Sequence, residues 1–587
     1  MLPVVPERVL TELGRTEGGP GTLGLLVRDQ HTRRLLLLRA VLDATEAADA
    51  GVCPPAARAR LREDWALLEE ADRVTPRAAP KTWGYAEAGA ASPAGEAGSM
   101  AFRSDGIPMA SRSDGIPMAS RSDGGPMAFR RDDTPPTSPG GAASMAFPRG
   151  GAPTGFLADG AWPASWDGGS LPASLGGASA ASPDDADPAG APLSPVRARL
   201  LHPFVGPWAR NCLRGLRAGG GSPTERDAHE LGRDLAYFGA LAAAAAVRAG
   251  VSFAVRLTAR DGVLTLPSLG ALRTAVPGDT PVDVVHRRNR LTLRRPGEAD
   301  IVVHPQTGIG AWSGSPAWTP AHALPGLLPG SAPLPLDDLD PYRTVRGEPR
   351  HHALSGPVAL DDAERKHWLH AWSGTATVLE VGGAQRLAEA VALLRCLVPL
   401  SAPPGTTHGG RPGGSCSGTR REAFGAVLSS APATATAFAA TLVHELQHAK
   451  LAALSDVLTL HHGGPEARYF APWRPDPRPY DGLLQGAYSH LALADFFQRS
   501  ALATTSPARR DAAWSQHARY RQQVGAVLPA LVGSGDLTSQ GRRFVDQMVG
   551  VYERLADHPA PRGQTARAQA YVRAARALWT QRHAPRE

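Results

Sequence analysis

The spacing of apolar and polar positions divides the chain into helical segments and a shorter group of strands. A helical period predicts helices at residues 4–14, 33–47, 56–71, 225–250, 361–372, 384–396, 482–497, 508–531, 540–555 and 566–579. Alternating or continuous apolar runs predict strands at residues 252–258, 262–266, 282–286, 290–293, 299–304, 377–381 and 424–429. Because most of the strands precede most of the helices, the pattern predicts an α+β fold, mostly helical with a small sheet.

Between about residue 80 and residue 195 the periodic pattern disappears. This stretch is rich in Gly, Pro, Ala and Ser, and it carries a nine-residue repeat that begins at Met100, Met109, Met118 and Met127. Such a composition cannot bury enough apolar surface to offset the entropy of ordering the chain. The sequence therefore predicts three parts: an N-terminal helical lobe at residues 1–78, a disordered insert at residues 79–197, and a main region at residues 198–587.

Charge and cysteine content exclude several classes of protein. The formal net charge is +7 over 587 residues, and no zinc-finger spacing, RNA-binding signature or long basic tail occurs, so no nucleic-acid partner is expected. The four cysteines are far apart in the sequence, which indicates a reducing compartment. No signal peptide is recognisable, and the most apolar stretch, residues 235–247, is too short to cross a bilayer. We expect a soluble, cytoplasmic protein with no membrane partner.

A helix expected to begin at Pro432 carries the most informative motif of the chain. His444, Glu445 and His448 form an H-E-x-x-H pattern, in which the two histidines are one helical turn apart on the same face. That spacing brings their Cβ atoms to about 5–6 Å, so both rings can reach one divalent metal ion. Glu445 can then act on a metal-bound water or hold a ligand in place. The alternative is a pair of core histidines that hydrogen-bond to other groups and bind no metal.

The strand expected at residues 424–429 leads into this helix. An edge strand in this position can pair with an extended peptide substrate. Arg420 and Arg421 stand beside the strand, so they are candidates for contacts with such a peptide. The arrangement points to a peptide as the partner.

A metal site needs at least one further protein ligand, because divalent ions in proteins generally have three or more. His490 is the first choice, since it lies in an otherwise apolar helical stretch downstream of the motif. Asp495 and Glu466 are the competing carboxylate donors. His461 and His462 are set aside because they precede two glycines at a helix end, where the helix dipole favours a histidine anyway.

Several stretches of the sequence resemble one known family. They are residues 235–246, 336–342, 421–428, 442–451, 473–479 and 482–490. Together they are similar to the H-E-x-x-H-motif proteins found beside gene clusters for ribosomally made peptides, and the similarity is strongest from residue 420 to residue 500. That family was long grouped with zinc peptidases, and its members are now regarded as iron- and 2-oxoglutarate-dependent peptide β-hydroxylases. The insert at residues 79–197 departs from the family pattern.

The resemblance implies an enzyme that hydroxylates a side chain of a ribosomally synthesised precursor peptide. It implies Fe(II) held by His444, His448 and a downstream ligand, with open positions for 2-oxoglutarate and O2. The far carboxylate of 2-oxoglutarate needs a cation, and arginine suits it because its planar fork makes paired hydrogen bonds with a carboxylate. Arg478 is the first candidate for this role and Arg474 is the second.

Glu445 distinguishes the two enzymatic alternatives. In a zinc metallopeptidase it would be the general base that takes a proton from metal-bound water. In an oxygenase it would orient a metal ligand or bind the metal itself. The spacing is compatible with both, so a Zn-dependent peptidase stays open beside the hydroxylase. A third alternative is a peptide-binding maturation scaffold without enzymatic activity.

Overall fold

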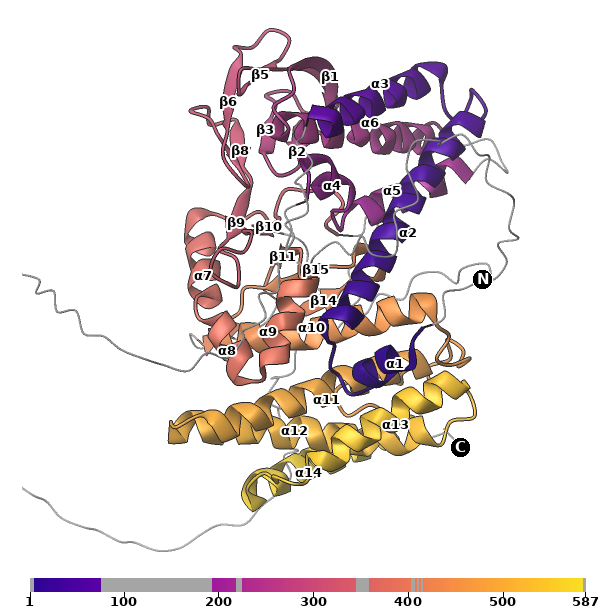
Figure 1. Ribbon diagram of the computed structural model, residues 1–587, viewed down its shortest axis with the longest axis vertical. Coiled ribbons are helices and arrows are strands. Elements are labelled where there is room, and N and C mark those ends of the chain that lie inside the picture. The colour runs from indigo at the N-terminus through magenta and orange to yellow at the C-terminus, as the bar shows by residue number, and fades with distance from the viewer. Residues whose placement is uncertain are drawn as a thin grey trace, which may run out of the picture. The chain divides into compact units, whose positions relative to one another are not determined.

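The helix that carries the motif, α10 (Ala435–Val457), packs against both a sheet and a layer of long helices (Figure 1). The computed structural model describes residues 5–74, 193–217, 224–344, 358–402, 407–408, 411–412 and 415–583. The predicted insert at residues 79–197 lies outside the described residues up to residue 192, and so do all of its repeats. The described residues form an α+β structure in which helices predominate over small sheets.

The sheet beside α10 has the order β14-β15-β11-β10-β9. Its strands are Ser417–Thr419, Ala426–Ser430, Cys396–Leu400, Leu334–Leu336 and His322–Leu324, in that order. Strands β15, β11 and β10 are mutually parallel, whereas β14 and β9 run antiparallel at the two edges. The strand expected at residues 424–429 is thus confirmed as β15. Its expected position at an edge is wrong, because β14 pairs with it and forms the edge near α10.

A layer of long helices follows α10 in sequence. These are α11 (Tyr480–Ala503), α12 (Pro507–Val532), α13 (Ser539–Arg554) and α14 (Arg562–His583). Helix α11 packs on α10 and on α12, which in turn contacts α13 and α14 (Figure 1). All four helices were expected from their apolar periodicity, with ends that differ by a few residues.

Three shorter helices precede the sheet strand β11. They are α7 (Asp362–Trp372), α8 (Thr375–Val381) and α9 (Ala384–Leu393). The strand predicted at residues 377–381 is wrong: Gly374, at φ +85°, turns the chain, and the next residues form a helix that buries Leu379. The helix predicted at residues 384–396 ends early, because the apolar run Cys396–Leu400 is a fully buried parallel strand. A short apolar run is ambiguous between these two structures by periodicity alone.

A second group of strands lies between α6 (Glu225–Arg248) and β9 in the sequence. One sheet has the order β1-β4-β5-β6-β7, with bounds Phe253–Ala259, Thr280–Arg287, Arg290–Arg294, Ile301–Pro305 and Ala311–Trp312. Another has the order β2-β3-β8, with bounds Val263–Leu266, Gly270–Arg273 and Trp318–Pro320. The hairpin expected around Arg288 and Asn289 is confirmed, since both residues have the positive φ that a two-residue hairpin turn requires.

Helices from two distant parts of the chain cover these strands. They are α3 (Pro55–Val74), α4 (Pro195–Leu200), α5 (Val205–Arg217) and α6. Trp208 and Phe238 stack at 5.6 Å between their ring centroids and lie at the centre of this core. Helix α4 includes residues 195–197, which the composition had placed in the insert. The remaining short elements are η1 (Arg421–Ala423), β12 (Thr407–His408) and β13 (Arg411–Pro412).

The N-terminal helices connect these regions. Helix α1 (Glu7–Gly14) packs on α13, and the 28-residue α2 (Pro20–Ala47) contacts α9 and α10 as well as α3 and α5 (Figure 1). The buried Arg34 of α2 donates hydrogen bonds to the carbonyl oxygens of Leu201 and Phe424. Gln30 donates to Asp456 at the end of α10 (2.8 Å). One helix therefore binds to loops and helices from three different parts of the chain.

A buried ion network fixes the turn between α1 and α2 to the helix that carries the motif. Lys450 of α10 lies 2.7 Å from Glu389 of α9, and Arg386 lies 3.2 Å from Glu389 and 3.3 Å from Asp495. Lys450 and Arg386 also donate to the carbonyl of Thr16, a residue with φ +62°. Since a buried charge is tolerated only with partners, this network fixes how α9, α10 and α11 pack.

Candidate functional site

Helix α10 presents His444 and His448 on one face. Its start is set by Thr434, whose hydroxyl accepts a hydrogen bond from the backbone N–H of Ala437 (3.1 Å), so the helix begins after this cap and not at Pro432. The centroids of the two imidazole rings are 4.6 Å apart, with an angle of 75° between the planes. The predicted pairing of the two motif histidines is therefore present.

Helix α11 brings His490 to the same place. Its ring centroid lies 5.6 Å from that of His444. Three imidazoles around one ion have centroids about 5 Å apart, given metal–nitrogen distances of roughly 2.0–2.1 Å. The structure thus gathers the three histidines that the sequence analysis proposed as ligands, each of them at least nine-tenths buried.

Hydrogen bonds orient two of the three rings. Nδ1 of His448 lies 3.1 Å from the side-chain oxygen of Gln485, which places the proton on Nδ1 and a lone pair on Nε2. Nδ1 of His444 lies 3.1 Å from Oε1 of Glu445, and its Nε2 lies 3.0 Å from the hydroxyl of Ser489. The contacts at Nδ1 of both rings are those that usually hold a metal-binding histidine in position. The Ser489 hydroxyl, in contrast, contacts Nε2 of His444, the nitrogen that would bind the metal.

Glu445 is fully buried and is held by two partners. The hydroxyl of Ser417, on the edge strand β14, donates to Oε1 at 2.7 Å, and His444 contacts the same oxygen. Burial alone would raise the pKa of Glu445, but the hydrogen bond from His444, the charges of His444 and His448 and the Ser417 bond together hold that pKa below its usual value. The second oxygen, Oε2, has no hydrogen-bond partner among the described residues.

His448 on α10 and His490 on α11 favour the neutral form. Burial, and then the neighbouring His444, lower the pKa of His448 to about 4. Burial foremost, followed by the charges of His444 and Arg519, holds the pKa of His490 well below its usual value. Nδ1 of His490 is buried and has no hydrogen-bond partner among the described residues. Neutral imidazoles with an available lone pair are what a metal ion requires.

The donor atoms are of the kind that binds a metal ion, but their positions in this structure do not suit one. Within the described ranges, no group of three or more His, Cys, Asp or Glu side chains is placed so as to hold a metal ion. In addition, the Ser489 hydroxyl lies 3.0 Å from Nε2 of His444, the nitrogen that would meet an ion. Binding an ion here requires rotation of at least one ring or of Ser489.

Aromatic side chains cover His490 from outside the cluster. The ring of Trp473 lies 4.5 Å from that of His490, and the ring of Tyr520 lies 5.1 Å from it, both edge to face. Trp473 can lie here because Gly486 has no side chain: a Cβ atom at that position would be 2.4 Å from the indole. The loop that carries Trp473 is fastened to α14, where the hydroxyl of Tyr571 donates to the carbonyl of Pro472 (3.2 Å).

Arg519 is a cation that lies beside these aromatic side chains. Its guanidinium carbon lies 6.0 Å from the ring of Tyr520 and 5.6 Å from that of Tyr571, and its Nε is buried without a hydrogen-bond partner among the described residues. Its charge is felt at His490. Sequence reasoning missed Arg519, because it lies on α12 and only the packing of α12 on α11 brings it near.

Most of the other candidate residues have partners of their own. Arg474 and Arg478 both approach Asp476, at 3.3 Å and 3.9 Å. Asp495 is engaged by Arg386 and Arg499, and Glu466 is exposed. These positions leave His490 as the candidate ligand on α11.

The two arginines near the edge strand are engaged within the protein. Arg420 donates to the carbonyl of Tyr342 (3.0 Å) and pairs with Glu422 at 2.6 Å. Arg421 pairs with Asp456. Their expected contacts with a peptide would have to compete with these bonds. Ser417, which the sequence did not single out, is the residue that links the edge strand to Glu445.

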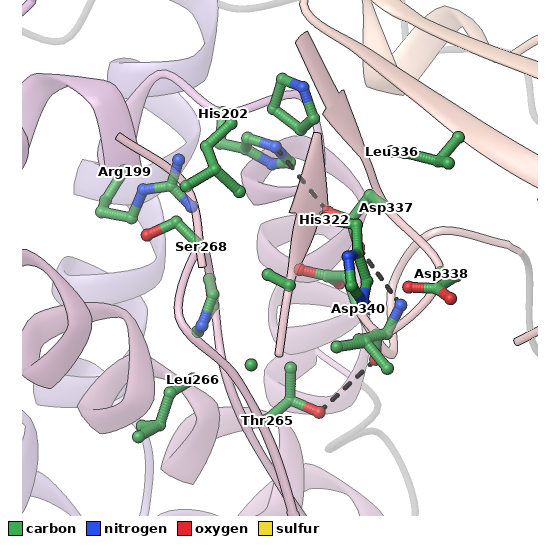
Figure 2. Close-up of a pocket in the computed structure, with 16 residues that line it drawn as sticks. Arg199, His202, Thr265, Leu266, Ser268, His322, Leu336, Asp337, Asp338 and Asp340 are labelled. Carbon is green, nitrogen blue, oxygen red and sulfur yellow. Dashed lines mark hydrogen bonds and ion pairs between the residues drawn. The ribbon is translucent and has the colours of Figure 1, made fainter. Parts of the chain in front are cut away.

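A cavity with an empty volume of about 410 Å³, part of it open to solvent, lies at a different place (Figure 2). It is bordered by the end of α4, the β2–β3 turn and the segment that follows β10. None of the three histidines lines it. It therefore belongs to a separate feature of the protein.

No known family model matches this chain, and no curated protein sequence is detectably similar to it. None of the helices among the described residues is long and apolar enough to span a bilayer.

Proposed function

We propose that this protein is a metal-dependent peptide-modifying enzyme that hydroxylates the β-carbon of a side chain in a ribosomally synthesised precursor peptide, with Fe(II) and 2-oxoglutarate. The observation that carries the proposal is the gathering of His444, His448 and His490 from two helices, with ring centroids 4.6 Å and 5.6 Å apart. These three residues would hold the ion. Bound Fe(II) and 2-oxoglutarate would supply the oxidising chemistry.

The contacts of Glu445 support an orienting role. Its Oε1 accepts from Ser417 and contacts Nδ1 of His444, which is how a carboxylate fixes the ring of a metal-binding histidine. Because Oε1 has these two contacts, only Oε2 of Glu445 is available to bind another group or to take a proton. A zinc metallopeptidase remains the second proposal, since Oε2 could still take a proton from metal-bound water.

The edge strand β14 supports a peptide substrate. It is a terminal strand of the sheet among the described residues, and Ser417 connects it directly to the motif. An extended peptide can add to such an edge through main-chain hydrogen bonds, which bind many sequences with one geometry. Such a peptide would run past the histidine cluster.

Arg519 is the proposed partner of the far carboxylate of 2-oxoglutarate. Its guanidinium has no ion pair or hydrogen bond among the described residues and stands next to Tyr520, which contacts His490. An arginine without an ion-pair partner can bind a carboxylate without first breaking another ion pair. Arg478 and Arg474 stay as alternatives, although both already approach Asp476.

The test is to purify the full chain without oxygen, reconstitute it with Fe(II), and measure whether 2-oxoglutarate is converted to succinate. We expect succinate formation with the wild type and with His462→Ala, whose histidine is exposed, and none with His448→Ala. Zinc-dependent cleavage of peptides that ignores 2-oxoglutarate would favour the peptidase. Absence of both activities from a protein that binds peptides would favour a scaffold.

A further inference from the structure

The cavity of Figure 2 contains two opposite charges that do not meet. Arg199, at the end of α4, borders one side of it, and Asp337, just after β10, borders the other. Arg199 is 9% exposed, and its guanidinium makes no ion pair or hydrogen bond with any described residue. The separation from Asp337 therefore exceeds that of an ion pair.

Asp337 has one oxygen available for a ligand. Its Oδ1 accepts backbone N–H groups of Leu339 (3.4 Å) and Asp340 (3.0 Å). Its Oδ2 lies 3.9 Å from Nε2 of His202 and has no hydrogen-bond partner among the described residues, and 19% of the side chain is exposed. A hydrogen bond at 3.9 Å is too long to satisfy a carboxylate, so this oxygen can accept a further donor.

Leaving the guanidinium of Arg199 and Oδ2 of Asp337 unsatisfied is costly. A buried guanidinium or carboxylate needs a partner to offset the loss of its hydration. Moving the two side chains into contact would satisfy both, yet the fold holds them apart: Asp337 is fixed by its two backbone bonds, and its own N–H donates to the carbonyl of Leu397 in β11 (2.8 Å). The position of Asp337 is therefore set by the backbone around it.

Two further carboxylates line the cavity, and both have partners within the protein. Oδ2 of Asp338 accepts the backbone N–H of Leu360 (2.9 Å) and lies 3.7 Å from Arg365, and Asp340 accepts the hydroxyl of Tyr237 (2.6 Å).

The other side chains of the wall are neutral. Burial lowers the pKa values of His202 and His322, so both rings are neutral at pH 7, and Nε2 of His322 has no hydrogen-bond partner among the described residues. Leu266, Ile309 and Leu336 supply apolar surface. Ser268 has φ +68°, a strained conformation for a residue other than glycine, and such strain gathers at ligand sites.

We propose that this cavity binds a free α-amino acid as a zwitterion, with its carboxylate on Arg199 and its ammonium group on Oδ2 of Asp337. Such a ligand carries both charges a few bonds apart, so one molecule can satisfy both residues. The apolar surface suits an aliphatic side chain. The site is separate from the histidine cluster, so a test of amino-acid binding does not depend on whether the protein is a hydroxylase.

The first test is a matched set of ligands titrated into the full-length wild-type protein by isothermal titration calorimetry. The probes are L-leucine, glycine, N-acetyl-L-leucine, which lacks the ammonium group, and L-leucinamide, which lacks the carboxylate. We expect saturable binding of L-leucine, and binding of the two derivatives that is weaker by roughly ten- to hundred-fold, the range expected for loss of a charge-assisted hydrogen bond. If neither L-leucine nor glycine binds, or if the derivatives bind as well as L-leucine, the proposal is overturned.

The second test uses substitutions on both sides of the cavity. Arg199→Gln and Asp337→Asn should each weaken L-leucine binding by roughly ten-fold or more. Arg197→Gln is the matched control, because Arg197 lies on the same short helix and is exposed. Equal affinity in Arg199→Gln and Arg197→Gln would exclude the site. If Arg199→Gln does not fold, as judged by circular dichroism, Asp337→Asn and the ligand set decide the question.

Discussion

The hydroxyl of Ser489 lies 3.0 Å from Nε2 of His444, between the two helices that carry the three histidines. The same hydroxyl is 3.2 Å from the carbonyl of Gly486 on its own helix. Ser489 can therefore give its proton to either acceptor. In the proposed metal site, this contact with His444 would compete with the ion for the same lone pair, so Ser489 would lower the affinity of the cluster for metal.

We expect Ser489→Ala to bind metal more tightly than the wild type. Removing the hydroxyl frees the lone pair of His444, and a neutral hydrogen bond contributes about 0.5–1.5 kcal/mol, which corresponds to a roughly two- to ten-fold gain in affinity. Competition with a chromophoric chelator measures this. Ser500→Ala is the control, because Ser500 bonds to the carbonyl of Phe496 on the same helix, outside the cluster. Weaker binding in Ser489→Ala would show that the serine supports the site.

The three histidines should differ from nearby ionisable residues in their effect on metal loading. His444→Ala and His448→Ala should abolish it and His490→Ala should weaken it strongly, because the remaining donors hold an ion poorly. Asp495→Ala should load normally but lose about 3 kcal/mol of unfolding free energy, because it leaves Arg386 with one buried partner fewer. Metal analysis of the folded fraction and urea unfolding separate the two effects. Full loading in His448→Ala would refute the site.

Arg519 should matter for binding 2-oxoglutarate and not for binding metal. We expect Arg519→Gln to weaken 2-oxoglutarate binding by roughly ten-fold or more in the anaerobic Fe(II) protein, since the charge-assisted pair is lost. Arg521→Gln is the matched control: Arg521 lies two residues further along α12 and stacks at 4.7 Å on Tyr552. Quenching of Trp473 fluorescence reports binding without turnover. If Arg478→Gln weakens 2-oxoglutarate binding and Arg519→Gln does not, Arg478 is the arginine that binds the carboxylate, as the sequence analysis expected.

Asp64 should make stability depend on pH. Burial, opposed by Arg60, raises the pKa of Asp64 to about 6 from its ordinary value of 3.8. The folded state therefore holds a proton that the unfolded state has released between these values, so the free energy of unfolding falls as pH rises from about 4 to about 6, by roughly 3 kcal/mol. Asp64→Asn should show a fall that is smaller than that of the wild type by this amount, and the exposed Asp72→Asn should fall as the wild type does. Urea unfolding across this range measures both, and a parallel decline in Asp64→Asn would contradict the assignment.

The local pattern of the sequence predicted the parts of the site that lie on helices. His444 and His448 follow from their spacing, and the apolar stretch around His490 predicted the helix that presents it. Gln485 and Ser489 are also four residues apart on that helix, a spacing that places them on one face. This signal was present in the sequence and would have identified both residues.

Other features depended on tertiary packing that no local pattern encodes. Ser417 reaches Glu445 from an edge strand of three residues, too short to be recognised by alternation. Arg519 lies on a helix whose polar and apolar positions do not mark it out. Residues 377–381 are rich in β-branched side chains and yet form part of a helix, because burying Leu379 against neighbouring helices outweighs local preference.

The length of α2 carries a consequence for how this sequence can vary. Twenty-eight residues at about 1.5 Å each make a helix of roughly 42 Å. It is anchored near its middle by Gln30 and Arg34 and closer to its C-terminal end by Val41. Deleting one residue between two anchors would rotate everything beyond it by about 100° around the axis. Substitutions on the solvent-exposed face of α2 are therefore tolerable. A single-residue insertion or deletion within α2 would prevent its apolar residues from packing into both hydrophobic cores at once.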